Sequence, residues 1–325
     1  MLDARGVIRR LTRVVRERIP SVEVPAHEPI ELAAPSLTSV LTEATEASAP
    51  MPSLWFRSAA LLDVRALQVR AAVQPDSPRL VNGISLTISR GEVVGLVGDA
   101  SSGAREVAQC IAGALPMPFV ICSGSILFNG VELVGLSVRS RGHPRDTKLA
   151  YLSLDPLDNL DPAATVGAQL TAPLRSQLGL SKPAAYERAI DLLHEVGVDR
   201  PEHTFTSHLR DLSVILAQRV QIAAALVGSP KLVVADDPTA ALNASDAADI
   251  LQLLRRLQRE QDWTMIIVTP SVSVAAQICH RVAVVCNGEI VEYASVADLF
   301  GSPAHPYTRE LLFANENEWP GTPAL

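Results

Sequence analysis

The stretch that decides the fold is GLVGDASSGAREVAQCIAG, which covers residues 95–113. It runs from an apolar strand through a glycine-rich turn into a helical pattern, which is the order of a phosphate-binding loop. Such a loop follows the pattern GxxxxGK[ST]: glycines let backbone amides converge on phosphate, the lysine neutralises charge and the hydroxyl binds magnesium. Here Gly98 and Gly103 keep the frame, but Ala104 and Arg105 replace the lysine and the hydroxyl.

A second segment, LVVADDPTAALNASD at residues 232–246, supports the interpretation of the loop. Its apolar run ends in Asp236, where a magnesium-binding carboxylate would follow a strand, and Asp237 comes next. A glycine-rich turn alone is weak evidence, because a tight strand-to-helix turn also uses glycine. The two segments together predict a nucleotide site or the remains of one.

The rest of the pattern predicts strands that alternate with helices. Helical periodicity is present around residues 104–114, 185–196, 214–227 and 244–260. Apolar or alternating runs predict strands within residues 61–69, 80–88, 92–98, 124–133, 149–154, 231–237, 264–269 and 281–293. This order predicts an α/β fold with a mostly parallel sheet, a more antiparallel N-terminal section and an inserted helical subdomain at about 155–228.

The composition limits the classes of function. The chain has 325 residues, a formal net charge of -7 and 48% hydrophobic residues, which suits one large α/β core. The acidic balance argues against a nucleic-acid partner. No charge-free apolar run approaches the ~20 residues of a membrane span, and the N-terminus lacks a secretion-signal pattern, so we expect a cytoplasmic protein. The four cysteines lack metal-type spacing and are expected to be small buried side chains.

The chain divides into four predicted parts. Residues 1–20 are predicted to be a basic amphipathic helix that lies on an anionic membrane, on an acidic partner or on its own domain, or else a partly ordered tail. Residues 21–55 are predicted to be a flexible linker. Residues 56–300 form the α/β domain, and residues 301–325 form a C-terminal tail.

The order of the motifs resembles that of the ATP-binding subunits of ABC transporters, most closely the oligopeptide and dipeptide importer branch. The resemblance covers about residues 61–312 and implies the P-loop NTPase-like fold of an ABC nucleotide-binding domain. The similar segments follow in family order: ISLTISRGEVVGLVGDASSGARE (84–106), SGSILFNGVEL (123–133), DPLDNLDPAATVGAQL (155–170), HLRDLSVILAQRVQIAAAL (208–226), RVAVVCNGEIVE (281–292) and GSPAHPYTRELL (301–312).

The departures from this family fall at positions that bind or hydrolyse ATP. Leu154 replaces the Q-loop glutamine, and Pro270 replaces the switch histidine. Asp237 replaces the glutamate that acts as general base, and Asn243 replaces the D-loop aspartate. The signature segment, LSGGQ in the family, here reads Leu212, Ser213, Val214, Ile215, Leu216.

The resemblance therefore implies a catalytically silent subunit of a heteromeric peptide-type importer, peripheral on the inner face of the cell membrane. Its implied partners are an intact ABC ATPase subunit, two membrane permease subunits and an extracellular substrate-binding protein. ATP and magnesium are expected at the partner's site, where Ser213 would face the partner's ATP. Asp236 would bind magnesium only if this chain bound nucleotide. No iron–sulfur cluster is expected, because no cysteine follows the HPYT motif at 305–308.

Several alternatives stay open. Arg105 either contacts a phosphate at the start of its helix or is a surface arginine. The chain is alternatively a weak ATPase that uses Arg105, Asp236 and Asp237, or a regulatory or scaffold protein detached from transport. The 155–170 segment either keeps the family's permease-docking surface or merely caps and turns local helices.

Overall fold

The computed structural model describes residues 60–72, 79–135 and 148–314. The predicted N-terminal helix (1–20) and linker (21–55) lie outside these residues. Within them, no helix has the length and apolar character that crossing a membrane requires. Two of the cysteines, Cys110 and Cys279, are buried as expected, but Cys122 is exposed and Cys286 is only half-buried, so the sequence expectation was wrong for this pair.

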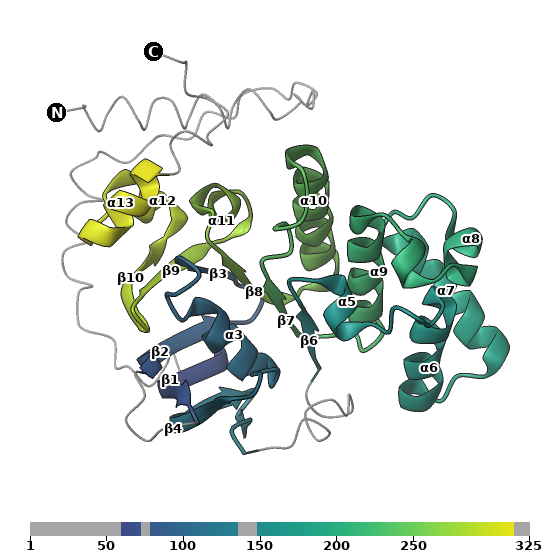
Figure 1. Cartoon of the computed structure of the whole chain (residues 1–325), viewed down its shortest axis with the longest axis horizontal. Helices are drawn as coiled ribbons and strands as arrows, with labels where there is room; N and C mark the ends of the chain where they lie inside the picture. The colour runs from purple at the N-terminus through teal and green to yellow at the C-terminus, as the bar shows by residue number, and fades with distance from the viewer. Residues whose placement is uncertain (1–59, 73–78, 136–147, 315–325) are drawn as a thin grey trace, which may run out of the picture. The chain divides into compact units, whose positions relative to one another are not determined.

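The N-terminal section is a four-stranded antiparallel sheet with the order β2-β1-β4-β5 (Figure 1). The central pair is joined in antiparallel register, with Leu62 opposite Phe128 and Val64 opposite Ile126. The strands are β1 (Ala60–Ala71), β2 (Arg79–Ser89), β4 (Phe119–Phe128) and β5 (Val131–Glu132).

The second sheet has six strands in the order β10-β9-β3-β8-β7-β6. β9, β3, β8, β7 and β6 are parallel neighbours, and β10 pairs with β9 in the antiparallel direction. The strands are β3 (Val93–Val97), β6 (Leu149–Leu152), β7 (Leu232–Asp236), β8 (Thr264–Thr269), β9 (Arg281–Cys286) and β10 (Glu289–Ser295).

A helical subdomain is inserted between β6 and β7. It contains α5 (Pro156–Asn159), α6 (Val166–Leu178), α7 (Lys182–Glu195), α8 (Pro201–Thr206), a 3-10 turn (Leu209–Asp211) and α9 (Val214–Leu226). The other described helices are α3 (Ala104–Ala112), α10 (Ala244–Gln261), α11 (Val272–Ile278), α12 (Val296–Gly301) and α13 (Pro306–Ala314). The α/β class, the mostly parallel core, the antiparallel section and the inserted helices are thus confirmed.

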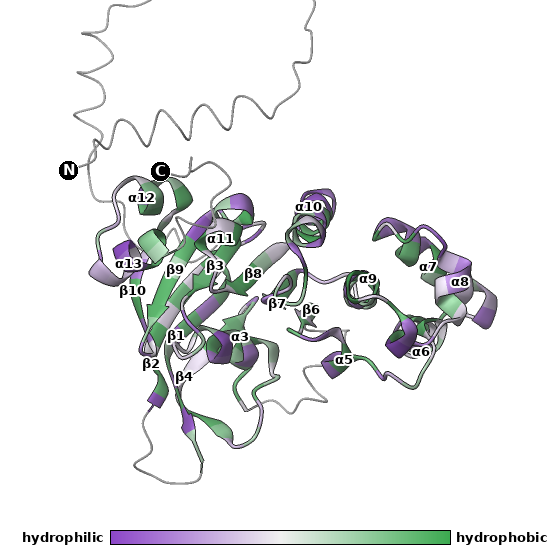
Figure 2. Cartoon of the chain, turned by 45° about the horizontal axis from the view of Figure 1, so that its top comes forward, coloured by the Kyte–Doolittle hydropathy of each residue, from purple (hydrophilic) through white to green (hydrophobic). Residues whose placement is uncertain are grey.

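The parallel strands separate two apolar cores, because successive side chains of a strand point to opposite faces. In β3, Val94 and Leu96 join the core formed with the antiparallel sheet and α3. Val93 and Val97 join the core formed with α9, α10 and the helical subdomain. Figure 2 shows these central strands in green, whereas much of α10 is purple on its outer side. Burial on both faces explains the continuous apolar runs of the sequence.

Candidate functional site

The predicted site residues lie at one edge of the parallel sheet. β3, β6, β7 and β8 run in the same direction, so the segments that follow them leave the sheet at the same edge. The loop 98–103 follows β3, and Leu154 follows β6. Asp236 and Asp237 lie at the end of β7, and Pro270 follows β8. The topology therefore assembles the segments that sequence analysis singled out.

The two framing glycines are required by local packing. Gly103 is the N-cap residue of α3 and has a φ of +93°, a left-handed conformation that favours glycine. A Cβ on Gly103 would overlap the carbonyl oxygen of Leu80, and a Cβ on Gly98 would overlap the carbonyl oxygen of Val285. The loop is also fixed by the Gly288 amide, which donates to the Ser102 carbonyl oxygen at 2.7 Å. The glycine frame thus has a structural cause that is independent of phosphate.

Inside the loop, the carboxylate of Asp99 accepts hydrogen bonds from neighbouring donors. The carboxylate of Asp99 accepts hydrogen bonds from the Ser101 amide (2.8 Å) and the Ser101 hydroxyl (2.6 Å). The Tyr307 hydroxyl, on α13, donates to the other Asp99 oxygen at 3.0 Å. Hydrogen bonding, above all from the Ser101 hydroxyl, keeps the pKa of Asp99 below its usual value. Asp99 is therefore negatively charged at neutral pH, which opposes a phosphate in the loop.

Asp236 is bonded through both of its carboxylate oxygens. Arg105 Nε donates to Oδ1 at 3.0 Å, and the Tyr151 hydroxyl donates to Oδ2 at 3.0 Å. The Asp236 side chain is only 2% exposed, whereas that of Arg105 is 40% exposed. Burial and the charge of Asp236 both raise the pKa of Tyr151, so its hydroxyl keeps its proton. Arg105 is thus neither a free phosphate ligand nor an unpartnered surface arginine, because it forms an ion pair with the predicted magnesium ligand.

Asp237 is close to this pair but has a different environment. Its residue surface is 9% exposed, and its backbone has a φ of +44°. Burial, followed by the negative charge of Asp236, raises the pKa of Asp237 to about 6, although Arg105 acts in the opposite direction. At neutral pH the ionised side chain therefore destabilises the folded state.

This raised pKa makes a prediction about stability. An acid whose pKa is higher when folded stabilises the fold fully at low pH and loses that contribution as pH rises through about 6. Asp237→Asn removes the charge, so we expect its free energy of unfolding to exceed that of the natural chain by roughly 1–2 kcal/mol at neutral pH, after a discount for solvent screening. The advantage should shrink steadily as the pH falls towards 4.5 in urea-unfolding measurements. A gap that does not change with pH would contradict this account.

The remaining predicted residues lie on separate segments. Leu154 is half-buried and Pro270 is exposed. Ser213 caps α9, where its hydroxyl oxygen accepts from the Leu216 amide at 3.4 Å. The side chain of Val214, which begins α9, is exposed. Position 214 therefore presents a β-branched side chain at the start of the helix.

The polar residues of the 155–170 segment have local partners. Asp155 caps α5, because its Oδ1 accepts from the Leu157 amide at 2.9 Å. Thr165 caps α6 by accepting from the Ala168 amide at 3.2 Å. Asp161 Oδ1 accepts from the Ala163 amide at 2.8 Å. Asp155 and Thr165 thus cap helices, and Asp161 holds a turn. Residues 157–159 and 161–163 remain exposed to solvent.

The comparisons with known proteins agree with this geometry. Residues 81–240 match the family model described as ABC transporter. The chain also matches the solved dimeric ATP-binding cassette MJ0796 in a post-hydrolysis state, with a TM-score of 0.63, 24% identity and coverage of 72% of this chain and 98% of that chain. CbiO1 from Clostridium perfringens gives the same TM-score and identity over 81% of this chain and 96% of that chain. The class defined by the fold and the loop is therefore the ATP-binding cassette.

Curated relatives define the branch. The oligopeptide transport ATP-binding protein OppD of Bacillus subtilis is 36% identical over 253 residues, which are 78% of this chain and 71% of that protein. The dipeptide transport ATP-binding protein DppD of Escherichia coli is 34% identical over 255 residues, 78% of each chain. The chain belongs to the ABC transporter family, in the branch of these ATP-binding proteins.

Membership of this family implies ATP and magnesium, but the residues of the loop do not fit them. Position 104 offers only a methyl group, and Ala104 is 2% exposed. The Ser101 amide, one of the loop's donors, is bonded to Asp99. Both oxygens of Asp236 have protein donors, one of which is a guanidinium that repels a metal ion. Among the described residues, no cluster of three or more His, Cys, Asp or Glu offers another metal site.

Three residues at this site were not singled out by the sequence reasoning. Tyr151 had no signal beyond its place in an apolar strand. Asp99 occupies one of the four unspecified positions of the loop pattern, so the motif assigns it no role. Tyr307 lies in the HPYT motif of the tail, but nothing in the sequence connects that motif with a loop 208 residues away.

Proposed function

We propose that this chain is a catalytically silent ATP-binding subunit of a heteromeric peptide-type importer. It completes the dimer of cassettes with a competent ATPase subunit and transmits closure driven by ATP at the partner's site. The main support for the loss of catalysis is that both carboxylate oxygens of Asp236 already accept hydrogen bonds, one from Arg105 and the other from Tyr151. Phosphoryl transfer depends on positioned charge, and here the groups that would supply it are replaced or already paired.

The assignment to peptide import rests on the relatives, whose names describe oligopeptide and dipeptide transport. The proposed partners are therefore an intact ATPase subunit, two permease subunits and an extracellular binding protein. The chain would then act at the inner face of the membrane, through the permease.

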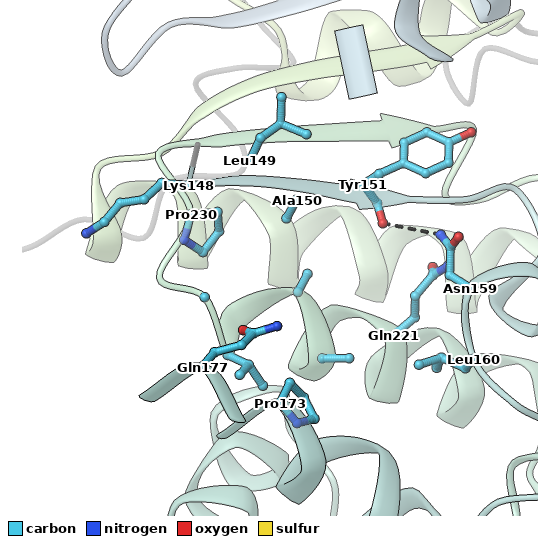
Figure 3. Close-up of a pocket in the computed structure, with 14 residues that line it drawn as sticks. Lys148, Leu149, Ala150, Tyr151, Asn159, Leu160, Pro173, Gln177, Gln221 and Pro230 are labelled. Carbon is cyan, nitrogen blue, oxygen red and sulfur yellow. Dashed lines mark hydrogen bonds between the residues drawn. The ribbon is translucent and has the colours of Figure 1, made fainter. Parts of the chain in front are cut away.

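The proposed contact with the permease lies in the region of the 155–170 segment. There a pocket of about 250 Å³ opens between β6 and the helical subdomain (Figure 3). Asn159 and Leu160 from the segment line this pocket, together with Pro173 and Gln177 of α6. A concave, mixed apolar and polar surface of this kind can receive a short helix or loop of a partner.

The central experiment is calorimetry of the full-length chain with Mg-ATP. We expect no saturable binding below millimolar concentration, because lysine, hydroxyl and free metal-binding carboxylate are absent together. Saturable binding at low micromolar concentration would contradict the silent-subunit proposal and favour a weak ATPase. Failure of the chain to co-purify with a permease would instead favour a scaffold protein detached from transport.

A further inference from the structure

Three core elements meet at the carboxylate of Asp236. α3 contributes Arg105, whose Nε donates to Oδ1, and β6 contributes Tyr151, whose hydroxyl donates to Oδ2. Asp236 itself ends β7. The buried carboxylate thereby joins a helix to two neighbouring strands.

A carboxylate that is 2% exposed needs a countercharge, because the desolvation of an unpaired ion is costly. Arg105 supplies this charge permanently, since a guanidinium does not lose its proton in proteins. It does so from the position at which a phosphate-binding loop would carry a metal-binding hydroxyl. A divalent ion next to Asp236 would therefore have to displace Arg105 and would meet its like charge.

We propose that Arg105 is an internal cation that takes the place of a divalent metal on Asp236, so that α3, β7 and β6 are held together without metal or nucleotide. This inference deepens the proposed function, on which it rests. A cassette that no longer binds Mg-nucleotide keeps the arrangement of its core through an ion pair of its own.

The internal cation also affects the helical subdomain through β6. Tyr151 is one residue from the end of β6, and its carbonyl oxygen accepts from Asn159 of α5 at 3.4 Å (Figure 3). Just beyond the strand, Ser153 Oγ accepts from Gln221 of α9 at 2.7 Å. Because β6 is held at Tyr151, it also holds the contacted parts of α5 and α9, the two helices that flank the proposed permease contact.

The first test compares Arg105→Ala with the natural full-length chain by thermal unfolding in EDTA and in millimolar MnCl2. The variant leaves Asp236 buried and unpaired, so we expect its Tm in EDTA to fall by roughly 5 °C or more. Manganese should recover part of this loss in the variant and should leave the Tm of the natural chain unchanged. Manganese EPR should likewise detect bound ion only in the variant.

Arg65→Ala is the matched control, because Arg65 forms an ion pair with Asp63 that is exposed to solvent. We expect its Tm to stay within about 2 °C of the natural chain, with no dependence on manganese. If Arg105→Ala is as stable as Arg65→Ala, or if manganese raises the Tm of the natural chain equally, the inference is wrong.

A double variant, Arg105→Ala with Asp236→Asn, separates charge from bulk. We expect it to be more stable than Arg105→Ala alone and insensitive to manganese, because no buried charge remains. If Arg105→Ala does not fold, a soluble double variant supports the inference, whereas an insoluble one contradicts it. These results test the inference separately from the proposed function. The proposed function would be contradicted by different results, namely binding of Mg-ATP by the natural chain or a role outside a transporter.

Discussion

Gly103→Ala is expected to destabilise this cassette by roughly 3–5 kcal/mol, enough to prevent folding of a marginally stable chain. Two effects add at this position. The residue has a φ of +93°, which is strained for alanine, and its Cβ would overlap the carbonyl oxygen of Leu80. Because Leu80 contributes backbone rather than a flexible side chain, the overlap cannot be relieved by a rotamer change. Urea unfolding of the variant and the natural chain measures the loss.

Gly83→Ala is the matched control for this prediction. Gly83 has a similar φ of +84°, but a Cβ there would meet nothing within 4 Å. We expect it to lose only about 1–2 kcal/mol, which is the cost of the left-handed backbone alone. Equal losses in the two variants would show that the overlap with Leu80 is relieved, and the packing explanation of the surviving glycine frame would then be wrong.

The strands and their order could be predicted because burial leaves a local signal. A strand covered on both faces must be apolar throughout, and β3, β7 and β8 are buried at every position. The alternation in β2 likewise follows from one exposed and one buried face. Such patterns are contained within one short segment, so the sequence is sufficient to detect them.

Some helices of the inserted subdomain were not predicted individually, for reasons that are also local. α6 contains Pro173, a residue that normally ends a helix. α5 and α8 are too short to show a helical period. Contacts with neighbouring helices and caps such as Thr165 determine these elements, and the hydrophobic pattern of a single segment does not record such contacts.

The site could be located but not described from the sequence. Motif spacing placed Arg105 and Asp236 in the same site, because Asp236 ends one parallel strand and Arg105 lies in the first turn of the helix after another strand of the same sheet. It did not predict that they pair, because the sequence offered only two alternatives for Arg105, a phosphate contact or a place on the surface of its helix. Tyr151 is 85 residues from Asp236, and its hydrogen bond depends on the register between β6 and β7.

The other large expected effect concerns the start of α9 and a partner's ATP. In this family the signature segment of one subunit faces the nucleotide bound by the other, and its glycines let helix amides approach the γ-phosphate. Here Val214 is 49% exposed at the first position of α9, and Ile215 packs partly against the apolar core. Ser213 is retained and caps the helix. The partner's ATP would therefore be bound chiefly by the partner's own loop. The start of α9 of this chain would close poorly onto that ATP.

Val214→Gly with Ile215→Gly is expected to raise the ATPase rate of the proposed heteromeric complex by about tenfold, because one recovered charge-assisted hydrogen bond of ~1.5 kcal/mol corresponds to that factor. Val214→Ala with Ile215→Ala is the control: it removes the branched side chains but keeps a Cβ, so a smaller increase is expected. Two glycines in the first turn of α9 cost roughly 1 kcal/mol each, so assembly of each complex is first verified by size-exclusion chromatography. An unchanged rate in an assembled glycine variant would mean that these two side chains do not limit closure on the partner's ATP.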